Sequence, residues 1–365
     1  MNRLVALCLP GGPSYVDAIR RIWDEGDAVF PVDQRLPKAS QADLIEHMAA
    51  SAIVDSGGEA SIAGRPVETG DALVVATSGS TGLPKGVVLT HDALAANAQA
   101  TNSFLGVESA SDKWLACLPL SHVGGFSVVV RALHSDVALE VHDGFDAGQV
   151  SQAARNGATL VSLVPTAMNR IDTAHFRKVL VGGSSVPSIR PSNVVATYGM
   201  TETGSGVVYD RRPLDGVELR VEQGEIQLRC PMLLRCYRDE TDPRTDDGWF
   251  PSGDAGSVDS DGLLTVHGRK GDMIITGGEN VWPVAVERLL ENVSGVAECA
   301  VVGRPDPEWG QIVTAVVVPL ANPPTLEKLR EQVKASLPGY CAPRSVELVD
   351  QLPRTSLGKL QRHRL

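Results

Sequence analysis

The ten residues at positions 77–86 read TSGSTGLPKG, and they follow the apolar run ALVVA at positions 72–76. Hydroxyl side chains, glycines and one lysine are gathered in this short stretch. A loop of this kind after a strand offers backbone N–H and side-chain O–H donors to phosphate oxygens. The stretch therefore predicts an anion-binding loop at the end of a strand, with a plain surface turn as the alternative.

The loop differs from a Walker-type phosphate loop. That loop carries glycine before its lysine and serine or threonine after it. Here Pro84 precedes Lys85 and Gly86 follows it. Proline also disfavours a helix that begins at the lysine. We therefore expect a phosphate-binding loop of another kind.

Length, composition and charge restrict the class of protein. The chain has 365 residues, which favours two domains or one large domain with an appendage. Its 43% hydrophobic residues predict a substantial core, and its net charge of −11 makes nucleic acid an unexpected partner. The six cysteines lack zinc-ligand spacing, which indicates reduced thiols in the cytoplasm. We read the apolar run at 4–9 as a strand, and no run approaches the roughly 20 residues of a membrane helix.

The pattern along the chain predicts an α/β fold. Short apolar runs alternate with helix-like segments as far as about residue 200, which favours parallel sheets covered by helices. Residues 207–266 alternate more and contain Gly and Asp turns, so antiparallel strands are expected there. The glycine-rich, charged stretch at 267–272 suggests a domain boundary, followed by a small α+β domain.

Seven motifs together resemble the adenylate-forming superfamily of acyl-CoA synthetases, luciferases and peptide-synthetase adenylation domains. After the loop at 77–86 they are LPLSHVGG at 118–125, VGGSSVP at 181–187, YGMTETG at 198–204, GWFPSGDAG at 248–256, GRKGDMIITGGENVWPVAVE at 268–287 and PRTSLGKLQR at 353–362. The resemblance implies a large N-terminal ATP- and acyl-binding domain at 1–268, a hinge at 269–271 and a small mobile C-terminal domain at 272–365. The large domain appears with a shortened N-terminal region, because the likeness begins at the first α/β unit of the family.

The resemblance also implies the chemistry. A carboxylate attacks the α-phosphate of ATP to give an acyl-adenylate and pyrophosphate, and a thiol, that of CoA, then displaces AMP. Glu202 matches the Mg²⁺ ligand of the family and Thr201 a neighbouring phosphate contact. Lys359 matches the lysine that stabilises the α-phosphate during adenylation. The residues implied to hold the phosphates are Thr77, Ser78, Gly79, Ser80, Thr81, Gly82 and Lys85.

The adenosine, CoA and hinge residues follow from the same motifs. Tyr198 offers a ring face to adenine, with Gly199 beside it, while Gly182, Gly183 and Ser184 border the opposite side. Asp254 matches the ribose ligand, for which a turn aspartate is the alternative, and Arg269 matches a ribose and phosphate contact. Gly277 and Gly278 are implied to line the pantetheine tunnel, with Trp309 as a CoA contact or a packing residue. Gly271 stands at the hinge, where the family commonly has Asp or Lys.

Of the three substrates, the carboxylic acid is the one that the sequence specifies least. Among the branches of the superfamily the chain looks most like short actinobacterial o-succinylbenzoate–CoA ligases of menaquinone synthesis, chiefly through LPLSHVGGFSVVVRAL at 118–133 and SLVPTAMNRI at 162–171. His122 and Gly125 are implied to border the acyl pocket, and His122 is also a catalytic candidate. The second carboxylate of such an acid needs a cationic partner when buried. Arg131 and Arg170 are candidates, and an outward-facing arginine is the alternative for each.

Three other functions stay open at this stage. The chain could activate another aromatic or aliphatic acid for CoA, or it could load a carrier protein as a stand-alone adenylation domain. A degenerate homologue without activity is the third alternative, and the intact Lys85, Glu202, Asp254, Arg269 and Lys359 argue against it. The expected partners are ATP, a small carboxylic acid and CoA, and a homodimer stays open.

Overall fold

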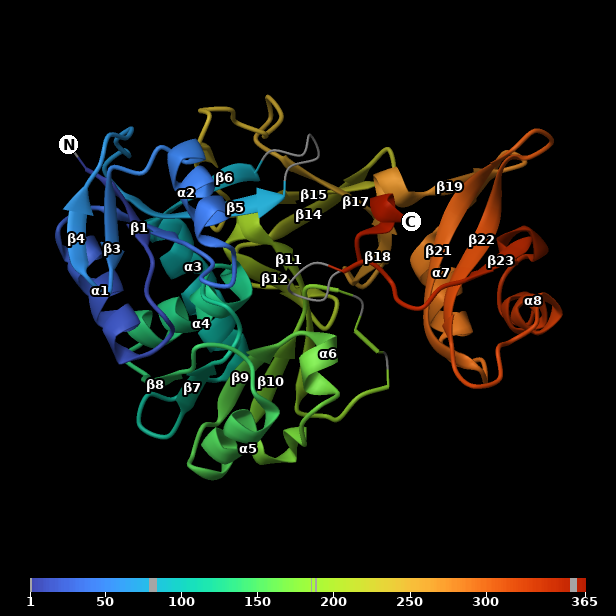
Figure 1. Ribbon diagram of the computed structural model, residues 1–365, viewed down its shortest axis with the longest axis horizontal. Coiled ribbons are helices and arrows are strands. Elements are labelled where there is room, and N and C mark those ends of the chain that lie inside the picture. The colour runs from blue at the N-terminus through green and yellow to red at the C-terminus, as the bar shows by residue number, and fades with distance from the viewer. Residues whose placement is uncertain (1, 79–83, 185, 188, 355–359) are drawn as a thin grey trace. The chain divides into compact units, whose positions relative to one another are not determined.

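The computed structural model describes residues 2–78, 84–184, 186–187, 189–354 and 360–365 (Figure 1). The chain divides into two compact units. The first unit consists of Met1–Leu219 with Leu228–Phe250, and the second consists of Arg220–Gln227 with Pro251–Leu365. Each unit is described by itself below.

The first sheet of the first unit has seven strands in the order β16-β6-β5-β2-β1-β3-β4. The strands are β1 Leu4–Leu7, β2 Ala28–Pro31, β3 Ala52–Asp55, β4 Gly58–Ser61, β5 Asp71–Ser78, β6 Pro84–Thr90 and β16 Cys236–Tyr237. Strands β3, β1, β2 and β5 run parallel, whereas β4, β6 and β16 pair antiparallel with their neighbours. The predicted parallel core is therefore correct, and antiparallel hairpins extend it at both edges.

The second sheet is also seven-stranded, in the order β13-β12-β11-β10-β9-β7-β8. Its strands are β7 Lys113–Ala116, β8 Ala138–Val141, β9 Leu160–Leu163, β10 Lys178–Val181, β11 Val194–Met200, β12 Ser205–Tyr209 and β13 Arg212–Pro213. The strands from β8 to β11 are parallel, and β12 and β13 return antiparallel. Buried runs such as LVSL in β9 are typical of parallel strands covered on both faces.

Helices cover these sheets, and the helix at His91–Leu105 contacts strands of both. The helices of the first unit are α1 Pro13–Asp24, α2 Lys38–His47, α3 His91–Leu105, α4 Val123–His134, α5 Ala147–Arg155 and α6 Pro165–Met168, with 3₁₀ turns η1 Thr173–His175 and η2 Thr201–Thr203. Helix α3 contacts β5 and β6 of the first sheet and β12 of the second, and α4 packs on α3, β7 and β9. The side chain of Thr90 accepts a hydrogen bond from Ala93 N and caps α3.

The second unit begins in a four-stranded sheet that the division of the chain crosses. Its order is β14-β15-β17-β18, with β14 Glu218–Glu222, β15 Glu225–Arg229, β17 Phe250–Val258 and β18 Leu264–Arg269. The strands β17 and β18 are antiparallel, as the alternating sequence predicts. The turn η3 Lys270–Asp272 follows β18 directly.

The rest of the second unit is the predicted small α+β fold. Its sheet contains β20 Glu279–Val281, β19 Ile274–Thr276, β22 Gly310–Pro319 and β21 Val296–Asp306 in that order, and β23 Ser345–Leu348 pairs with β22. The helices α7 Pro283–Leu290 and α8 Leu326–Lys334 cover one face, where Val301, Val313 and Val317 point. The alternate residues Val302 and Val316 point to the other face and contact Leu352, Leu360 and Leu365 of the C-terminal segment.

The compact units do not divide where the domain boundary was predicted. Residues 251–268 group with the C-terminal part, so the predicted hinge at 269–271 lies inside the second unit. The reason is that β17 and β18 pair from Asp254–Arg269 to Val258–Leu264, with one register shift after Ala255, which ties the two strands into one unit. The hinge stays a prediction about movement. Within the described part of the chain, no helix has both the length and the apolar character needed to cross a membrane.

Candidate active site

The loop at 77–86 is the tip of a β-hairpin. In the antiparallel register of β5 and β6, Thr77 lies opposite Lys85 and Ser78 opposite Pro84. The Thr77 hydroxyl donates to the Lys85 carbonyl oxygen at 3.3 Å. Lys85 therefore stands in a strand, as expected for a loop that is not of the Walker type. Gly79, Ser80, Thr81 and Gly82 lie outside the described residues, and their phosphate contacts stay predictions.

Lys85 and Glu202 are brought to the same aromatic ring. The Lys85 Nζ lies 4.8 Å from the ring centroid of Tyr237, and the Tyr237 hydroxyl donates to Glu202 Oε1 at 3.0 Å. Burial and the Glu202 charge raise the pKa of Tyr237, so the phenol stays protonated and can donate. Tyr237 lies in none of the seven motifs, so the sequence analysis did not single it out. Only the pairing of β16 with β6 places it here.

The surroundings of Glu202 fit a magnesium ion that also binds phosphate. Glu202 lies in η2 next to Thr201, and its backbone carbonyl accepts from Leu234 N at 2.7 Å. Among the described residues, Glu202 Oε2 accepts no hydrogen bond, and no group of three or more His, Cys, Asp or Glu could hold a metal alone. Mg²⁺ commonly binds through one or two carboxylates together with substrate phosphates and water. The single carboxylate is therefore sufficient only when a phosphate substrate supplies further oxygens.

Glycines at the ends of β10 and in β11 allow close approach beside Tyr198. A Cβ on Gly182 would lie 2.3 Å from Thr197 Oγ1, and one on Gly199 would lie 2.2 Å from the Ser205 carbonyl oxygen. Gly183 has φ +82°, which favours glycine. Because β10 and β11 are parallel with Val181 opposite Ala196, the chain after Val181 runs toward Tyr198. Tyr198 is half-buried, and the glycines in these two segments carry no side chains that could cover its ring. Ser184, which follows Gly183, is exposed.

Asp254 and Arg269 form an ion pair in the second unit. They lie opposite each other in β17 and β18, with Arg269 Nε 3.0 Å from Asp254 Oδ1. Asp254 is buried within a strand, so the alternative of a turn aspartate is wrong. Arg269 Nη1 also donates to the Ser252 carbonyl at 3.0 Å, which orients the guanidinium beside the carboxylate. This pair presents both charges expected of a ribose and phosphate contact.

His122 immediately precedes helix α4 and faces an acidic residue. Its Nε2 lies 3.9 Å from Asp33 Oδ2, and Arg35 donates to the same carboxylate. Burial lowers the pKa of His122, so the imidazole is neutral near pH 7. Its Nε2 has no hydrogen-bond partner among the described residues. Gly125 is buried, and a Cβ there would lie 2.5 Å from the Leu118 and Pro119 carbonyl oxygens, so it permits close packing under α4.

Arg131 points into the protein and lacks a carboxylate partner among the described residues. Its side chain is 1% exposed, and its guanidinium donates to Ser205 Oγ at 2.8 Å and Ser162 Oγ at 3.2 Å. It also lies over the Trp114 ring, 5.5 Å from the centroid. Burial lowers the pKa of Arg131. The outward-facing alternative is therefore wrong for Arg131, whereas Arg170 is exposed and lies over Phe145.

The predicted CoA residues meet at the β19–β20 hairpin. Gly277 and Gly278 form its two-residue turn with φ +59° and +84°, a turn that requires glycine-like conformations whatever its function. A Cβ on Gly277 would lie 2.7 Å from the Trp309 ring, and the Arg344 guanidinium lies 3.8 Å from the centroid of that ring. Trp309 is thus a packing partner of the turn and half-exposed. Its contact with CoA stays a prediction.

The predicted hinge residue Gly271 and the predicted catalytic residue Lys359 remain. Gly271 lies in η3, where its φ is not positive and an added Cβ meets no atom within 4 Å. Lys359 lies outside the described residues. Its catalytic part stays a prediction, although Arg354 and Leu360 on either side of the segment are described and form an isolated antiparallel bridge.

A hairpin whose sequence is rich in glycine and hydroxyl residues, with a lysine and a single carboxylate at one tyrosine ring, is the arrangement expected of enzymes that form adenylates. Comparison with family models agrees: the model described as AMP-binding enzyme matches residues 63–237, and the AMP-binding enzyme C-terminal domain matches 285–359. The chain belongs to the AMP-binding enzyme family. The predicted fold class and superfamily are therefore confirmed.

Named relatives and solved structures are similar along most of the chain. A probable 2-succinylbenzoate–CoA ligase of Mycobacterium tuberculosis is 39% identical over 82% of this chain and 85% of its own length. A feruloyl-CoA synthase of Amycolatopsis is 36% identical over 79% and 68%. Two structures of the Bacillus subtilis o-succinylbenzoate CoA synthetase (MenE), one with the acyl-adenylate OSB-AMP and one with ATP and magnesium, are each 26% identical with a TM-score of 0.87. The matches cover 99% and 100% of this chain and 87% and 89% of those chains.

Proposed function

We propose that this chain is an ATP-dependent ligase that joins o-succinylbenzoate to coenzyme A through an acyl-adenylate. The mycobacterial relative named for this activity and the Bacillus subtilis structure holding OSB-AMP support the choice of acid. The observation in the chain itself that carries the proposal is Arg131. A buried guanidinium is costly to desolvate and is normally compensated by an anion.

Arg131 can select a dicarboxylic acid. Its hydrogen-bond partners among the described side chains are the neutral hydroxyls of Ser162, Ser205 and Tyr209. Ser205 is only half-buried, and it also accepts a hydrogen bond from Ser127 on the same helix as Arg131. A carboxylate that binds beside Ser205 would be attracted by the positive charge of the Arg131 guanidinium without forming a direct ion pair with it. The carboxylate that is not activated is the group that fits this position.

In the first half-reaction the substrate carboxylate attacks the α-phosphorus and pyrophosphate leaves. Two anions must approach each other, so fixed positive charge and oriented donors lower the barrier. Lys85 and the hairpin loop bind the β- and γ-phosphates, and Lys359 stabilises the charge that develops on the α-phosphate. Glu202, oriented by the Tyr237 hydroxyl, would hold Mg²⁺, which neutralises phosphate charge when bound. Asp254 accepts from the ribose hydroxyls, and Tyr198 stacks on adenine.

In the second half-reaction the CoA thiol attacks the acyl carbon and AMP leaves. The bare backbone at Gly277 and Gly278 suits the narrow approach of pantetheine, and the neutral His122 stands at the acyl side. The small domain pivots at Gly271 between the two half-reactions. The cytoplasmic location and a homodimer remain predictions.

The alternative is a ligase for an aromatic monocarboxylic acid, in line with the feruloyl-CoA synthase relative. The apolar residues of α4, such as Phe126 and Val130, are equally compatible with such an acid. An acid without a second carboxylate would leave Arg131 with its hydroxyl partners alone. The two candidates are therefore separated by their dependence on that second carboxylate.

The test is pyrophosphate exchange with o-succinylbenzoate, its monomethyl ester at the benzoate carboxyl, ferulate and benzoate, followed by addition of CoA or a carrier protein. We expect exchange with o-succinylbenzoate to exceed that with the ester and ferulate by at least about tenfold in kcat/KM. CoA, rather than the carrier protein, should then release AMP. Equal exchange with the ester and the parent acid would reject the dicarboxylate assignment, and thioester formation on the carrier protein alone would reject CoA.

A further inference from the structure

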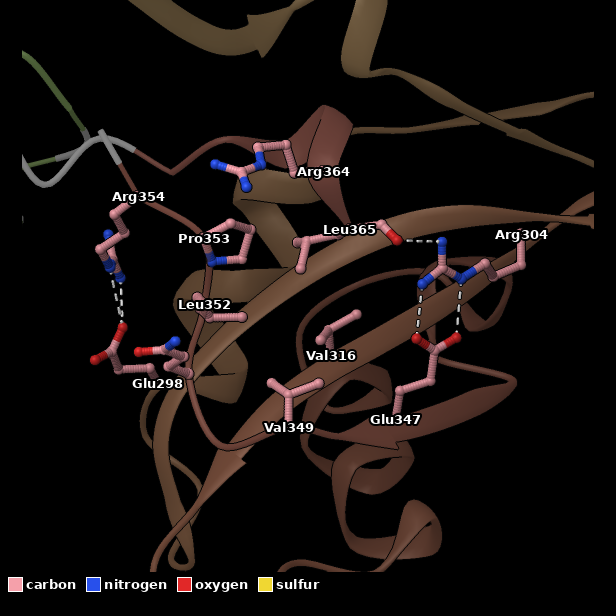
Figure 2. Close-up of a pocket in the computed structure, with 11 residues that line it drawn as sticks. Glu298, Arg304, Val316, Glu347, Val349, Leu352, Pro353, Arg354, Arg364 and Leu365 are labelled. Carbon is pink, nitrogen blue, oxygen red and sulfur yellow. Dashed lines mark hydrogen bonds and ion pairs between the residues drawn. The ribbon is translucent and has the colours of Figure 1, made fainter. Parts of the chain in front are cut away.

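Arginine side chains in this protein are held in two ways. Figure 2 shows the first way, at a hollow in the second unit, where Arg304 forms a fork with Glu347 and Arg354 pairs with Glu298. Arg238 of the first unit is held in the second way. It is 6% exposed, and among the described residues its guanidinium donates only to backbone carbonyl oxygens. Such an arginine joins segments of the backbone to one another.

The guanidinium of Arg238 binds two segments of the chain. Its Nε donates to the Met48 carbonyl oxygen at 3.1 Å and its Nη2 to that of Ala49 at 3.3 Å, directly after helix α2. Its Nη1 donates to the Pro66 carbonyl oxygen at 2.8 Å, and Nη2 also donates to that of Arg65. The two segments bind each other as well, since Arg65 N donates to the Ala49 carbonyl oxygen at 2.9 Å. Four acceptors around a planar donor group fix both its place and its orientation.

The backbone of Arg238 is bound to strand β6. Arg238 N donates to the Gly86 carbonyl oxygen at 2.6 Å, next to the pair in which Tyr237 lies opposite Val87. Strand β16 is only two residues long, so it has few ladder bonds of its own. A Cβ on Gly86 would lie 2.7 Å from the Cβ of Arg238, which shows how closely the two backbones approach. Arg238 therefore gives this short strand a fixed end directly after Tyr237.

The side chain of Tyr237 depends on the position of this strand. Its hydroxyl donates to Glu202 Oε1 at 3.0 Å, and its ring lies 4.8 Å from Lys85 Nζ. The hydroxyl is at the far end of a rigid ring, so a small rotation of the backbone at Tyr237 displaces it from Glu202. A hydrogen bond weakens steeply when its distance and angle depart from the preferred values. The bond to Glu202 therefore needs a strand that does not move.

We infer that Arg238 is a positioning residue for Tyr237, and through Tyr237 for Glu202, in the binding of Mg·ATP. This inference rests on the part of the proposed function in which Glu202 would hold Mg²⁺. All three residues belong to the first unit. A weaker anchor at Arg238 should release the phenol from Glu202 and lower the affinity for ATP only when Mg²⁺ is present. A purely structural arginine would instead lower stability alone, or lower ATP affinity equally with and without Mg²⁺.

The first experiment uses Arg238→Lys in the full-length protein. Lysine keeps the positive charge, but its single ammonium group cannot reach four carbonyl oxygens in the geometry of the guanidinium. Calorimetric titration measures the Kd for ATP with saturating Mg²⁺ and again in EDTA. We expect the Kd with Mg²⁺ to rise about tenfold and the Kd in EDTA to stay within about twofold. Equal weakening under both conditions, or no weakening with Mg²⁺, would overturn the inference.

A double-mutant cycle tests whether Arg238 acts through the phenol. Tyr237→Phe removes the hydroxyl and keeps the ring. In that background Arg238→Lys should weaken Mg·ATP binding by no more than about a further twofold, whereas multiplied losses would show another route and reject the inference. Arg238→Gln enters the same cycle as a second variant. Glutamine keeps two N–H donors for the carbonyl oxygens and has no charge to desolvate, so this variant tests the anchor if the lysine variant does not fold.

The matched control is Arg330→Lys in the second unit. Arg330 is also partly buried and also donates to a backbone carbonyl oxygen, that of Pro343 at 2.6 Å. This variant can lower the melting temperature, but its Kd for Mg·ATP should stay within about twofold of wild type. A tenfold rise in the control as well would mean that the effect of Arg238→Lys is not specific, and would reject the inference.

The titrations need no acid, so they separate this inference from the choice of substrate. If no acid supports pyrophosphate exchange while Arg238→Lys loses affinity only with Mg²⁺, the proposed ligase activity fails and the positioning inference stands. If o-succinylbenzoate supports exchange and Arg238→Lys binds Mg·ATP as tightly as wild type, only the inference fails.

Discussion

The roles of single residues in this protein depend on neighbours that are distant in the chain. Glu202 and Tyr237 are 35 positions apart, and Lys85 reaches the same ring from another strand. The phenol is a neutral group between an ammonium and a carboxylate, so it can orient Glu202 without neutralising it.

We predict that Tyr237→Phe weakens the use of Mg²⁺ and ATP without preventing folding. Loss of one hydrogen bond to a half-exposed carboxylate should raise KM for Mg·ATP about tenfold, or about 1.4 kcal/mol. The measurement is pyrophosphate exchange against Mg²⁺ at saturating acid. Tyr340→Phe, at an exposed tyrosine of the second unit, serves as the control. A KM within about twofold of wild type would mean that Glu202 is oriented by other groups.

We predict that Arg131→Met raises KM for o-succinylbenzoate about a hundredfold, which corresponds to about 3 kcal/mol, and leaves KM for ATP unchanged. Methionine is apolar and flexible, so it can fill the buried space without leaving a charge unpaired. A melting curve checks the fold. The matched control is Arg170→Met, which changes an exposed arginine over an aromatic ring. If both variants bind the acid equally well, Arg131 has only a structural part.

At the scale of elements, two segments that the sequence analysis treats as loops are the connections of β-hairpins. The phosphate loop connects β5 and β6, and the glycine pair of TGGEN connects β19 and β20. In each case the register, fixed by strands on both sides, determines which residues flank the turn. The β19–β20 turn also carries a packing constraint, because Trp309 lies against Gly277 but not against Gly278.

We predict that Gly277→Ala is more harmful than Gly278→Ala. Both residues have positive φ, so alanine should cost about 1–2 kcal/mol of unfolding free energy at either position. Only Gly277→Ala adds a clash, with its Cβ 2.7 Å from the indole ring. Urea unfolding measures the difference, and the thioester rate shows whether displacement of Trp309 affects CoA. Equal losses of stability in the two variants would contradict the packing argument.

At the scale of the whole molecule, the proposed mechanism needs two settings of the predicted small domain, one for each half-reaction. Gly271 is suited to a pivot, since its surroundings leave room for a side chain and its φ is not positive. The aspartate that the family commonly has should therefore fit there. Proline, in contrast, fixes φ near −65° and removes an N–H donor.

We predict that Gly271→Asp retains both half-reactions, whereas Gly271→Pro retains one and severely slows the other. The measurements are pyrophosphate exchange and single-turnover thioester formation from the adenylate. If Gly271→Pro leaves both rates within about twofold, under about half a kcal/mol of barrier, the pivot lies at another residue. Asp272 is the neighbouring position to examine in that case, because it contacts Arg362.

The sequence by itself determined the class of fold, the order of the functional segments and the chemical types within them. Apolar runs, turn residues and the seven motifs are local patterns, because backbone conformation and phosphate recognition depend on residues close together in the chain. They predicted a phosphate-binding loop that is not of the Walker type, and they placed Glu202, Asp254 and Arg269 in their segments. The small α+β fold likewise follows from strand and helix periodicity.

Only the tertiary structure decided which of these residues meet and which way they face. Tyr237 reaches Glu202 because β16 pairs with β6, and Arg131 faces inward because α4 packs on α3 and β9. The link from Arg362 to Glu287 and Asp272 spans 75 and 90 positions. No local pattern encodes such pairings, because they depend on strand order and helix packing, in which residues far apart in the chain compete for the same contacts.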